Sequence, residues 1–154
     1  FNQAATNKGV LLSPIVNMSV LQTTIQVPKW KLLYVLPEVC SVKCENALYS
    51  IAQVRSALGK ESDRAEVVVI THEKSNIAQL AQLKEKQNIR FLNTNIKSLQ
   101  QMFKETSTDA IFIADTLGNI ILRFPLQIDE KQAILDSRDI LSDMRKLLKL
   151  SRIG

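Results

Sequence analysis

The sequence has little of several residue types on which specialised small proteins depend. Among its 154 residues, cysteine occurs only twice, and glycine and proline occur four times each. Two cysteines are too few for a disulfide scaffold and fit a single functional pair better. The scarcity of glycine and proline argues against a linker or a turn-rich all-β chain. What remains is the composition of one globular domain, with 45% hydrophobic and 23% charged residues.

Long apolar runs and concentrated basic patches are missing as well. No run of roughly eighteen apolar residues occurs, so no part of this sequence is predicted to span a bilayer. The net charge is +5, and the basic residues are spread from Lys8 to Arg152 without interleaved aromatic residues. This pattern argues against nucleic-acid binding. Because the chain begins with Phe1 rather than Met, we expect that a leader or anchor segment has been removed.

Short apolar runs rich in β-branched and aromatic residues predict the strands. The run from Ala65 to Thr71 is continuous, as in an internal strand of a sheet. Residues 115–118 predict a turn in which Gly118 takes a positive φ, so the runs on either side form a hairpin. Residues 9–15 favour an edge strand limited by Pro14. Further strands are predicted over residues 30–36, 65–71, 89–92, 110–114 and 119–124.

Apolar residues spaced three and four apart predict the helices. The first helix, residues 42–58, carries an apolar stripe that only Arg55 interrupts, and Gly59 is a good stop for it. The stripe consists of Cys44, Leu48, Ile51 and Leu58.

Three more helices are predicted over residues 76–86, 96–103 and 129–150. Ser75 is expected to cap the first of these, with Ile77 facing inward. The last has Ile134 in its buried stripe and room for a break near Asp136 or Ser137.

The order of these elements predicts an α/β fold. A β-α-β beginning requires parallel strands, whereas the hairpin before the last helix requires an antiparallel pair. We therefore expect a mixed central sheet with helices on both faces. This order, with a cysteine pair after the first core strand, is the order of the thioredoxin-like fold. Residues 1–28 are expected to form an N-terminal extension with short strands, and residues 29–154 the thioredoxin-like domain.

The two cysteines, Cys40 and Cys44, lie where the first core strand gives way to a helix. Free N–H groups and the dipole at a helix N-terminus favour a thiolate. Lys43 adds positive charge there, which Glu38 and Glu45 oppose. Positions i and i+4 of a first helical turn lie about 6 Å apart, within disulfide reach. Two thiolates also suit Cu(I). The alternative is that both thiols are small buried hydrophobes, which Cys44 suits better than Cys40.

The C-x-x-x-C segment Cys40-Ser41-Val42-Lys43-Cys44, following the strand pair Leu32-Leu33, resembles the SCO/SenC branch of thioredoxin-fold proteins. The turn at residues 114–119 also resembles that branch. More narrowly, three stretches resemble the short, membrane-anchored SCO-like proteins encoded beside cytochrome oxidase assembly factors in proteobacteria. These stretches are ENALYSIAQVRSALGKESDR, DTLGNIILRF and MRKLLKLSRIG.

The resemblance implies a periplasmic domain tethered to the inner membrane by a single N-terminal anchor that is absent from this chain. It implies a role in assembling the copper centre of cytochrome c oxidase, as copper carrier or thiol reductant. The partner would be a cytochrome c oxidase subunit or an assembly protein. Cys40 and Cys44 would be the catalytic pair, and copper would bind Cys40, Cys44 and His72, the only histidine of the chain. Ser107 stands where the family has its copper-binding histidine, and no proline precedes residues 110–114.

Three functions follow from these residues. The first is thiol-disulfide or copper chemistry in oxidase assembly, with Cys40 as nucleophile and Cys44 as resolving thiol. If the protein is an enzyme, it is a thiol-disulfide oxidoreductase. The second is a non-catalytic binding module that carries a static disulfide and docks on an oxidase subunit or assembly partner. The third is a peroxidase, which the adjacent Ser41 would suit. It is the weakest of the three because no T-x-x-C pattern precedes Cys40. The departures from the family pattern favour thiol chemistry over copper delivery.

Overall fold

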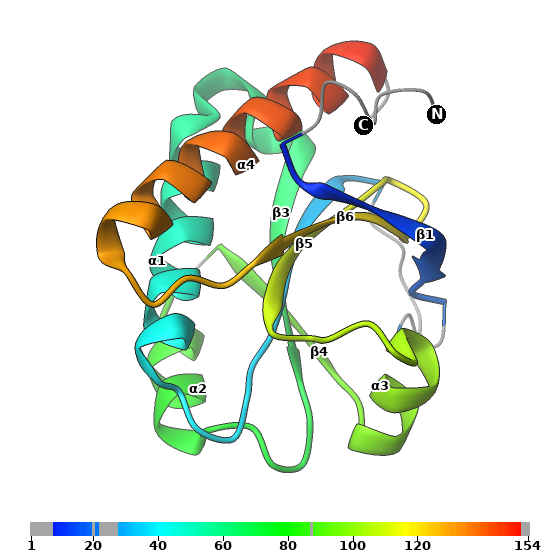
Figure 1. The fold of residues 1–154 in the computed structure, drawn as a ribbon, viewed down its shortest axis with the longest axis vertical. Helices are drawn as coiled ribbons and strands as arrows, with labels where there is room; N and C mark the ends of the chain where they lie inside the picture. The colour runs from blue at the N-terminus through cyan, green and yellow to red at the C-terminus, as the bar shows by residue number, and fades with distance from the viewer. Residues whose placement is uncertain (1–7, 20, 22–27, 87, 152–154) are drawn as a thin grey trace.

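The computed structural model describes residues 8–19, 21, 28–86 and 88–151, and these form one mixed six-stranded sheet with helices on both faces (Figure 1). The strand order is β1-β6-β5-β2-β3-β4. Strands β2, β3 and β4 are parallel, and β5, β6 and β1 continue the sheet in antiparallel fashion. The strands are β1 (Val10–Asn17), β2 (Trp30–Val35), β3 (Ala65–Thr71), β4 (Ile89–Asn93), β5 (Ala110–Ala114) and β6 (Asn119–Pro125). The predicted α/β architecture is confirmed.

Helices of unequal length cover the two faces of the sheet. One face packs against α1 (Val42–Ala57), α2 (Ile77–Lys84) and α4 (Glu130–Ser151). The other packs against α3 (Ile96–Phe103) and the segment that follows β1. A 3₁₀ helix, η1 (Gly59–Arg64), links α1 to β3 and begins at Gly59, whose φ of +58° ends α1 as the sequence predicts.

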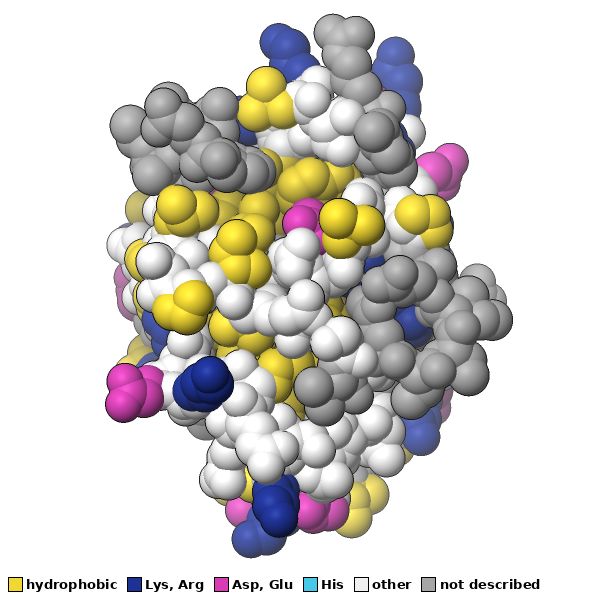
Figure 2. All heavy atoms as spheres, turned by 90° about the vertical axis from the view of Figure 1, so that its right-hand side faces the viewer, with side chains coloured by type: hydrophobic (Ala, Val, Ile, Leu, Met, Phe, Trp, Pro, Cys, Tyr) yellow, Lys and Arg dark blue, Asp and Glu magenta, His cyan; other side chains and the backbone are white. Residues whose placement is uncertain are grey.

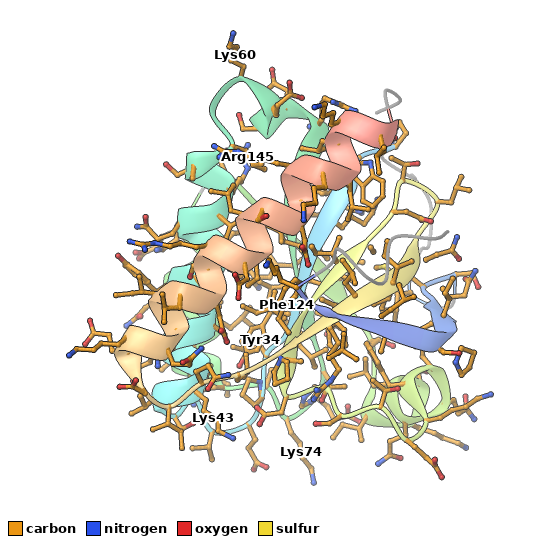
Figure 3. The ribbon with its side chains drawn as sticks, turned by 45° about the horizontal axis from the view of Figure 1, so that its top comes forward. Tyr34, Lys43, Lys60, Lys74, Phe124 and Arg145 are labelled. Carbon is orange, nitrogen blue, oxygen red and sulfur yellow. A yellow bond between two sulfur atoms is a disulfide. The ribbon has the colours of Figure 1, made fainter. Side chains whose placement is uncertain are left out.

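Strand β2 divides the core into two layers because successive side chains of a strand point to opposite faces. Leu32 and Tyr34 enter the layer under α1 and α4, and Leu33 enters the layer under α3. Figure 3 shows Tyr34 and Phe124 beneath α4. All six residues of β2 are buried, so the strand before the cysteines is held rigidly on both sides.

Strand β1 is an edge strand, as predicted, and its entry into the sheet is fixed by α4. The buried carboxylate of Asp143 accepts hydrogen bonds from the backbone N–H groups of Lys8 (2.9 Å) and Gly9 (2.8 Å). Gly9 has no room for a side chain, because a Cβ there would lie 2.6 Å from the ring of Phe124. The register with β6 shifts between residues 11 and 16, around Pro14, which interrupts the exposed edge.

Figure 2 shows the side of the molecule that carries β1 and α3, where hydrophobic side chains gather over the middle of the face and charged ones lie mostly toward its edges. Val10 and Ile15 of β1 are among the exposed apolar residues of the chain. Residues 1–7, 20 and 22–27 of the predicted N-terminal extension lie outside the described residues, and the division of the chain at residue 28 stays a prediction.

A buried charge network lies at the start of β2. Lys31 is fully buried, and its ammonium lies 3.7 Å from the carboxylate of Glu66 and 2.7 Å from the carbonyl oxygen of Lys29. Arg90 donates two hydrogen bonds to the same carboxylate. Burial lowers the pKa of Lys31, and the nearby Glu66 carboxylate opposes that shift. The network joins β2, β3 and β4 at the end opposite the cysteines.

Helix α4 departs from the sequence prediction, because it runs from Glu130 to Ser151 without a break near Asp136 or Ser137. The Ser137 hydroxyl donates to the carbonyl oxygen of Ala133 (2.9 Å) and contacts the Ser50 hydroxyl on α1 (2.8 Å). The helix therefore accommodates this polar residue at an interface. Ile134, predicted to be buried, is 41% exposed.

Helix α2 also differs from its prediction. The capping residue is Asn76, whose side chain accepts the N–H of Gln79 (2.9 Å), and not Ser75. Ser75 is buried and donates to the carbonyl oxygen of Leu36 instead. Ile77, predicted to face inward, is 83% exposed.

Candidate thiol-disulfide site

The candidate site lies at the carboxyl ends of β2 and β3, which meet at one edge of the sheet because the two strands are parallel. The loop after β2 carries the cysteines, and the loop after β3 carries His72. Hydrogen bonds join the two loops. The N–H of Asn76 donates to the carbonyl oxygen of Pro37 (2.8 Å), and the Asn76 side chain donates to that of Glu38 (3.1 Å). The cysteine loop is therefore supported by its neighbour.

Cys40 and Cys44 form a disulfide, with their Cα atoms 5.0 Å apart. Cys40 lies before the helix and is partly exposed, whereas Cys44 lies in the first turn of α1 and is 2% exposed. Ser41 is the N-cap residue, and its carbonyl oxygen accepts the first helical hydrogen bond, from Glu45 (3.0 Å). The two sulfur atoms thus differ in accessibility and share the N-terminal end of one helix.

An ion pair lies close to the disulfide. The ammonium of Lys43 is 3.3 Å from the carboxylate of Asp109, which immediately precedes β5. This contact joins the cysteine loop to a second segment and offsets the positive charge between the two cysteines. Burial raises the pKa of Tyr34 in the adjacent strand, and the Asp109 carboxylate raises it further. Figure 3 shows Lys43 and Lys74 at one end of the molecule and Lys60 at the other.

His72 is held by its own loop. Its Nδ1 accepts the N–H of Lys74 (3.1 Å), and its backbone N–H donates to the Ser75 hydroxyl (3.0 Å). The Nδ1 atom of His72 is therefore occupied by a hydrogen bond within its own loop. His72 lies on the predicted edge of the sheet, but its ring is engaged locally.

With the disulfide closed, Cys40 and Cys44 cannot ligate a copper ion. The sulfur atoms of Cys40 and Cys44 are bonded to each other, and a thiolate is the form that ligates copper. Among the described residues, no group of three or more His, Cys, Asp or Glu side chains could hold a metal ion. Ser107 stands where the resemblance to SCO/SenC proteins implies a histidine, and its hydroxyl accepts the N–H of Asp109 (3.2 Å). Copper ligation by Cys40, Cys44 and His72 stays a prediction.

Exposed apolar side chains lie on the cysteine loop and on two segments that hydrogen-bond to it or to α1, a feature that the sequence patterns did not reveal. Val39 (73% exposed) and Val42 (54%) flank Cys40 directly. Ile128 (66%) is brought beside α1 because the Asn46 side chain donates to its carbonyl oxygen. Ile77 follows the loop that binds Pro37 and Glu38. We call these four side chains the apolar collar. They come from three separate segments, so sequence periodicity carries no signal for them.

A known protein family matches the region of the chain that contains the cysteine pair and most of the sheet. The model of a family described as "Transmembrane-like, thioredoxin-like, C-terminal domain" matches residues 30–151. The chain belongs to this family. The match begins at the first residue of β2 and ends at the last residue of α4, so it includes the disulfide and all four helices. No helix among the described residues combines the length and apolarity needed to cross a bilayer.

Solved structures share the fold of this family member. Arabidopsis thaliana ScoI with copper bound is 14% identical at a TM-score of 0.56, covering 79% of this chain and 87% of ScoI. A SCO1/SenC family lipoprotein from Bacillus anthracis is 13% identical at 0.56, covering 79% and 83%. A putative thiol:disulfide interchange protein DsbE from Chlorobium tepidum is 10% identical at 0.56, covering 89% and 95%. The thioredoxin-like fold is therefore confirmed, as is the resemblance to SCO/SenC proteins at the level of fold. No curated protein matches the sequence.

Proposed function

We propose that this protein exchanges disulfides with a partner protein through Cys40 and Cys44. The observation that carries the proposal is the asymmetry of the pair, since Cys40 is partly exposed and Cys44 is buried at the start of the same helix. An accessible sulfur is attacked first, and a shielded one leaves and later resolves. The fold shared with a putative thiol:disulfide interchange protein supports the same chemistry.

The exchange proceeds in two balanced steps. A thiolate of the partner attacks Cys40 Sγ, the Cys40–Cys44 bond breaks, and Cys44 leaves as a thiolate at the N-terminal end of α1, where it gains a proton. A second partner thiolate then attacks the partner's sulfur in the mixed disulfide and releases Cys40. The partner loses two electrons and two protons and gains a disulfide, and the Cys40–Cys44 pair becomes a dithiol. The reverse sequence reduces a partner disulfide.

The apolar collar gives the partner a surface to bind. Val39, Val42 and Ile128 are each more than half exposed, although apolar side chains are costly to leave in water. A partner segment with apolar residues beside its cysteines would cover them while it reaches Cys40. The Lys43–Asp109 ion pair forms a polar border to this surface.

We further propose that the exchange serves cytochrome c oxidase assembly on the periplasmic side of the inner membrane. The partner would be an oxidase subunit or assembly protein, and a membrane anchor would precede this domain. The three stretches that resemble membrane-anchored SCO-like proteins support this setting, as does the fold shared with ScoI. We prefer thiol exchange to copper delivery as the function for two reasons. Ser107 stands where the resemblance to SCO/SenC proteins implies a histidine, and the His72 ring accepts a hydrogen bond from Lys74.

The test compares two single substitutions in glutathione redox buffer. Cys44→Ser leaves the exposed sulfur, so we expect a stable mixed disulfide with glutathione at Cys40, read as a mass increase on the intact protein. Cys40→Ser leaves only the buried sulfur and serves as the matched control, with a mixed disulfide forming at least tenfold more slowly. A wild-type disulfide that stays closed in every buffer in which the protein remains folded would contradict thiol exchange and favour the static binding module.

A further inference from the structure

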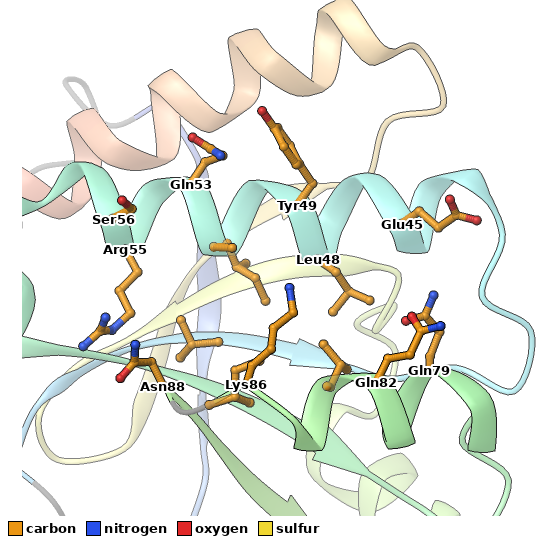
Figure 4. Close-up of a pocket in the computed structure, with 15 residues that line it drawn as sticks. Glu45, Leu48, Tyr49, Gln53, Arg55, Ser56, Gln79, Gln82, Lys86 and Asn88 are labelled. Atoms are coloured by element: carbon orange, nitrogen blue, oxygen red, sulfur yellow. The ribbon is translucent and has the colours of Figure 1, made fainter.

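A groove lies between helices α1 and α2, away from the exposed sulfur of the redox pair (Figure 4). Its cavity volume is about 620 Å³, within the range of small-molecule binding sites. Its floor is apolar and is built by both helices and the sheet. The floor residues are Leu48, Ile51, Val67, Leu83 and Ile89.

The groove is open because α4 packs against the opposite flank of α1 and does not cover this one. Small and polar residues of α1, including Ala47 and Ser50, lie buried on that side. On the α2 side, α1 presents Ala52, whose short side chain leaves the space unfilled, and α2 ends after eight residues. Ile51, Val67 and Leu83 are buried under the floor, whereas Leu48 and Ile89 are half-buried and give the groove most of its exposed apolar surface.

Two cations face this cavity from opposite sides. Figure 4 shows Arg55 reaching from α1 toward Asn88, and Lys86 reaching from the end of α2 toward α1. Among the described residues, neither cation has an ion-pair partner. Arg55 is half-buried and occupies a position of the apolar stripe that faces the groove. Two like charges across one cavity repel, and an anion between them would remove that repulsion.

We propose that this groove binds a small amphiphilic carboxylate, of the class of a medium-chain fatty acid. The carboxylate lies between Arg55 and Lys86, where guanidinium and ammonium groups donate charge-assisted hydrogen bonds to it. The alkyl chain lies on the apolar floor toward Leu48. The Glu45 carboxylate at the other end of the groove repels a second negative charge and so fixes the orientation. This site uses neither cysteine and does not depend on the proposed redox function.

The dimensions and polarity of the groove favour this ligand over a partner helix. Arg55 and Leu48 lie seven positions apart in α1, which is about 10 Å along the helix. A medium-length alkyl chain spans that distance. The rim carries the side-chain amides of Gln53, Gln79 and Gln82, which a packed partner helix would have to desolvate and a single alkyl chain would leave in water.

Binding is measured by calorimetric titration of the full chain with sodium decanoate below its micellar concentration. We expect saturable binding at one site. The double substitution Arg55→Gln with Lys86→Gln should weaken it at least tenfold, whereas Lys97→Gln with Lys131→Gln should change it less than twofold. The control pair removes the same charge from exposed positions that do not line the groove. Decanol, which has the same chain without the charge, should bind at least tenfold more weakly than decanoate.

A second variant separates the groove from the rest of the surface. Ala52→Trp fills the cavity from an exposed position of α1, so we expect it to abolish decanoate binding while the circular dichroism spectrum is unchanged. The proposal is overturned if decanoate does not bind the folded wild-type protein, or if either groove variant binds it as wild type does. It is also overturned if an amphipathic helical peptide, and not decanoate, shifts the amide resonances of Leu48 and Leu83.

Discussion

The two flanks of helix α1 differ in how far neighbouring elements cover them. The flank toward α4 is the more closed of the two, although a cavity of about 230 Å³ remains between the helices. Specific contacts join them, including the Ser50–Ser137 hydroxyl pair (2.8 Å) and a hydrogen bond from Arg145 to the carbonyl oxygen of Ala57 (2.9 Å). The flank toward α2 carries Leu48 and Arg55 beside an open cavity. The difference teaches that an apolar stripe on a helix does not by itself say whether the stripe is covered.

The strongest test of this difference removes packing on the closed flank. Ile140 of α4 is fully buried beside Ala47 and Ser50. Ile140→Ala should lower the free energy of unfolding by about 2–5 kcal/mol, because it removes buried methylene groups and leaves a cavity. Leu135→Ala, at a position of the same helix that is 49% exposed, should change it by about 0.5 kcal/mol or less. Urea unfolding of both variants measures this, and equal losses would mean that α4 does not pack as described.

A smaller effect is expected from the polar contact on the same flank. Ser137→Ala removes the hydroxyl that contacts buried Ser50, so it should cost about 1–3 kcal/mol of unfolding free energy. Ser56→Ala, on the exposed flank of α1, is the matched control and should be close to neutral. Thermal unfolding monitored by circular dichroism distinguishes the two. A neutral Ser137→Ala variant would show that the serine pair contributes no stability.

Tyr34 lies in the core layer beneath α1, and Tyr49 lies on the exposed surface of that helix, so substitutions of the two report on these two environments. Tyr34 is buried, and its raised pKa means that the folded state keeps the phenol protonated at a pH where the unfolded chain ionises it. Stability is therefore lost as pH rises above about 10, the ordinary tyrosine pKa.

At pH 11, this loss from Tyr34 amounts to about 1 kcal/mol. In Tyr34→Phe the fall in unfolding free energy between pH 9 and pH 11 should be smaller by that amount. Tyr49→Phe, at a position 58% exposed, should leave the fall unchanged. Urea midpoints at the two pH values measure both slopes, and identical slopes in all three proteins would contradict the assignment.

The smallest effect on stability is expected on the open flank. Arg55→Leu completes the apolar stripe of α1 without filling a packed core, so the free energy of unfolding should change by about 0.5 kcal/mol or less. The same substitution should weaken decanoate binding. A stability loss comparable to that of Ile140→Ala would mean that Arg55 is a structural residue, and that the two flanks are equivalent after all.

Much of the fold could be predicted because periodicity reports the local environment of each element. The bounds of α3 and β5 agree with the prediction residue for residue, and Gly118 has the positive φ that its turn requires. The cysteine pair could be found as well, since its spacing lies within disulfide reach and the structure joins the two sulfur atoms.

What could not be predicted depends on contacts between distant segments. Ser75 looked like a helix cap, but its hydroxyl is taken by the carbonyl oxygen of Leu36 across the loop, so the cap moves to Asn76 and Ile77 becomes exposed. Likewise, the apolar collar comes from segments as far apart as residues 39 and 128. In the sequence, Arg55 only interrupts the apolar stripe of α1, whereas in the structure it lines the groove.

The carboxylate of Asp143 has a mechanical consequence. A pull on the chain at Lys8 reaches this carboxylate before it reaches strand β1, because Asp143 binds the N–H groups of Lys8 and Gly9. The load then passes into α4, which is anchored in the core by Ile140 and Met144. Without that clamp, the same pull would peel β1 from the edge of the sheet one hydrogen bond at a time. A domain held by its N-terminal end thus transmits tension into its centre and spares strand β1.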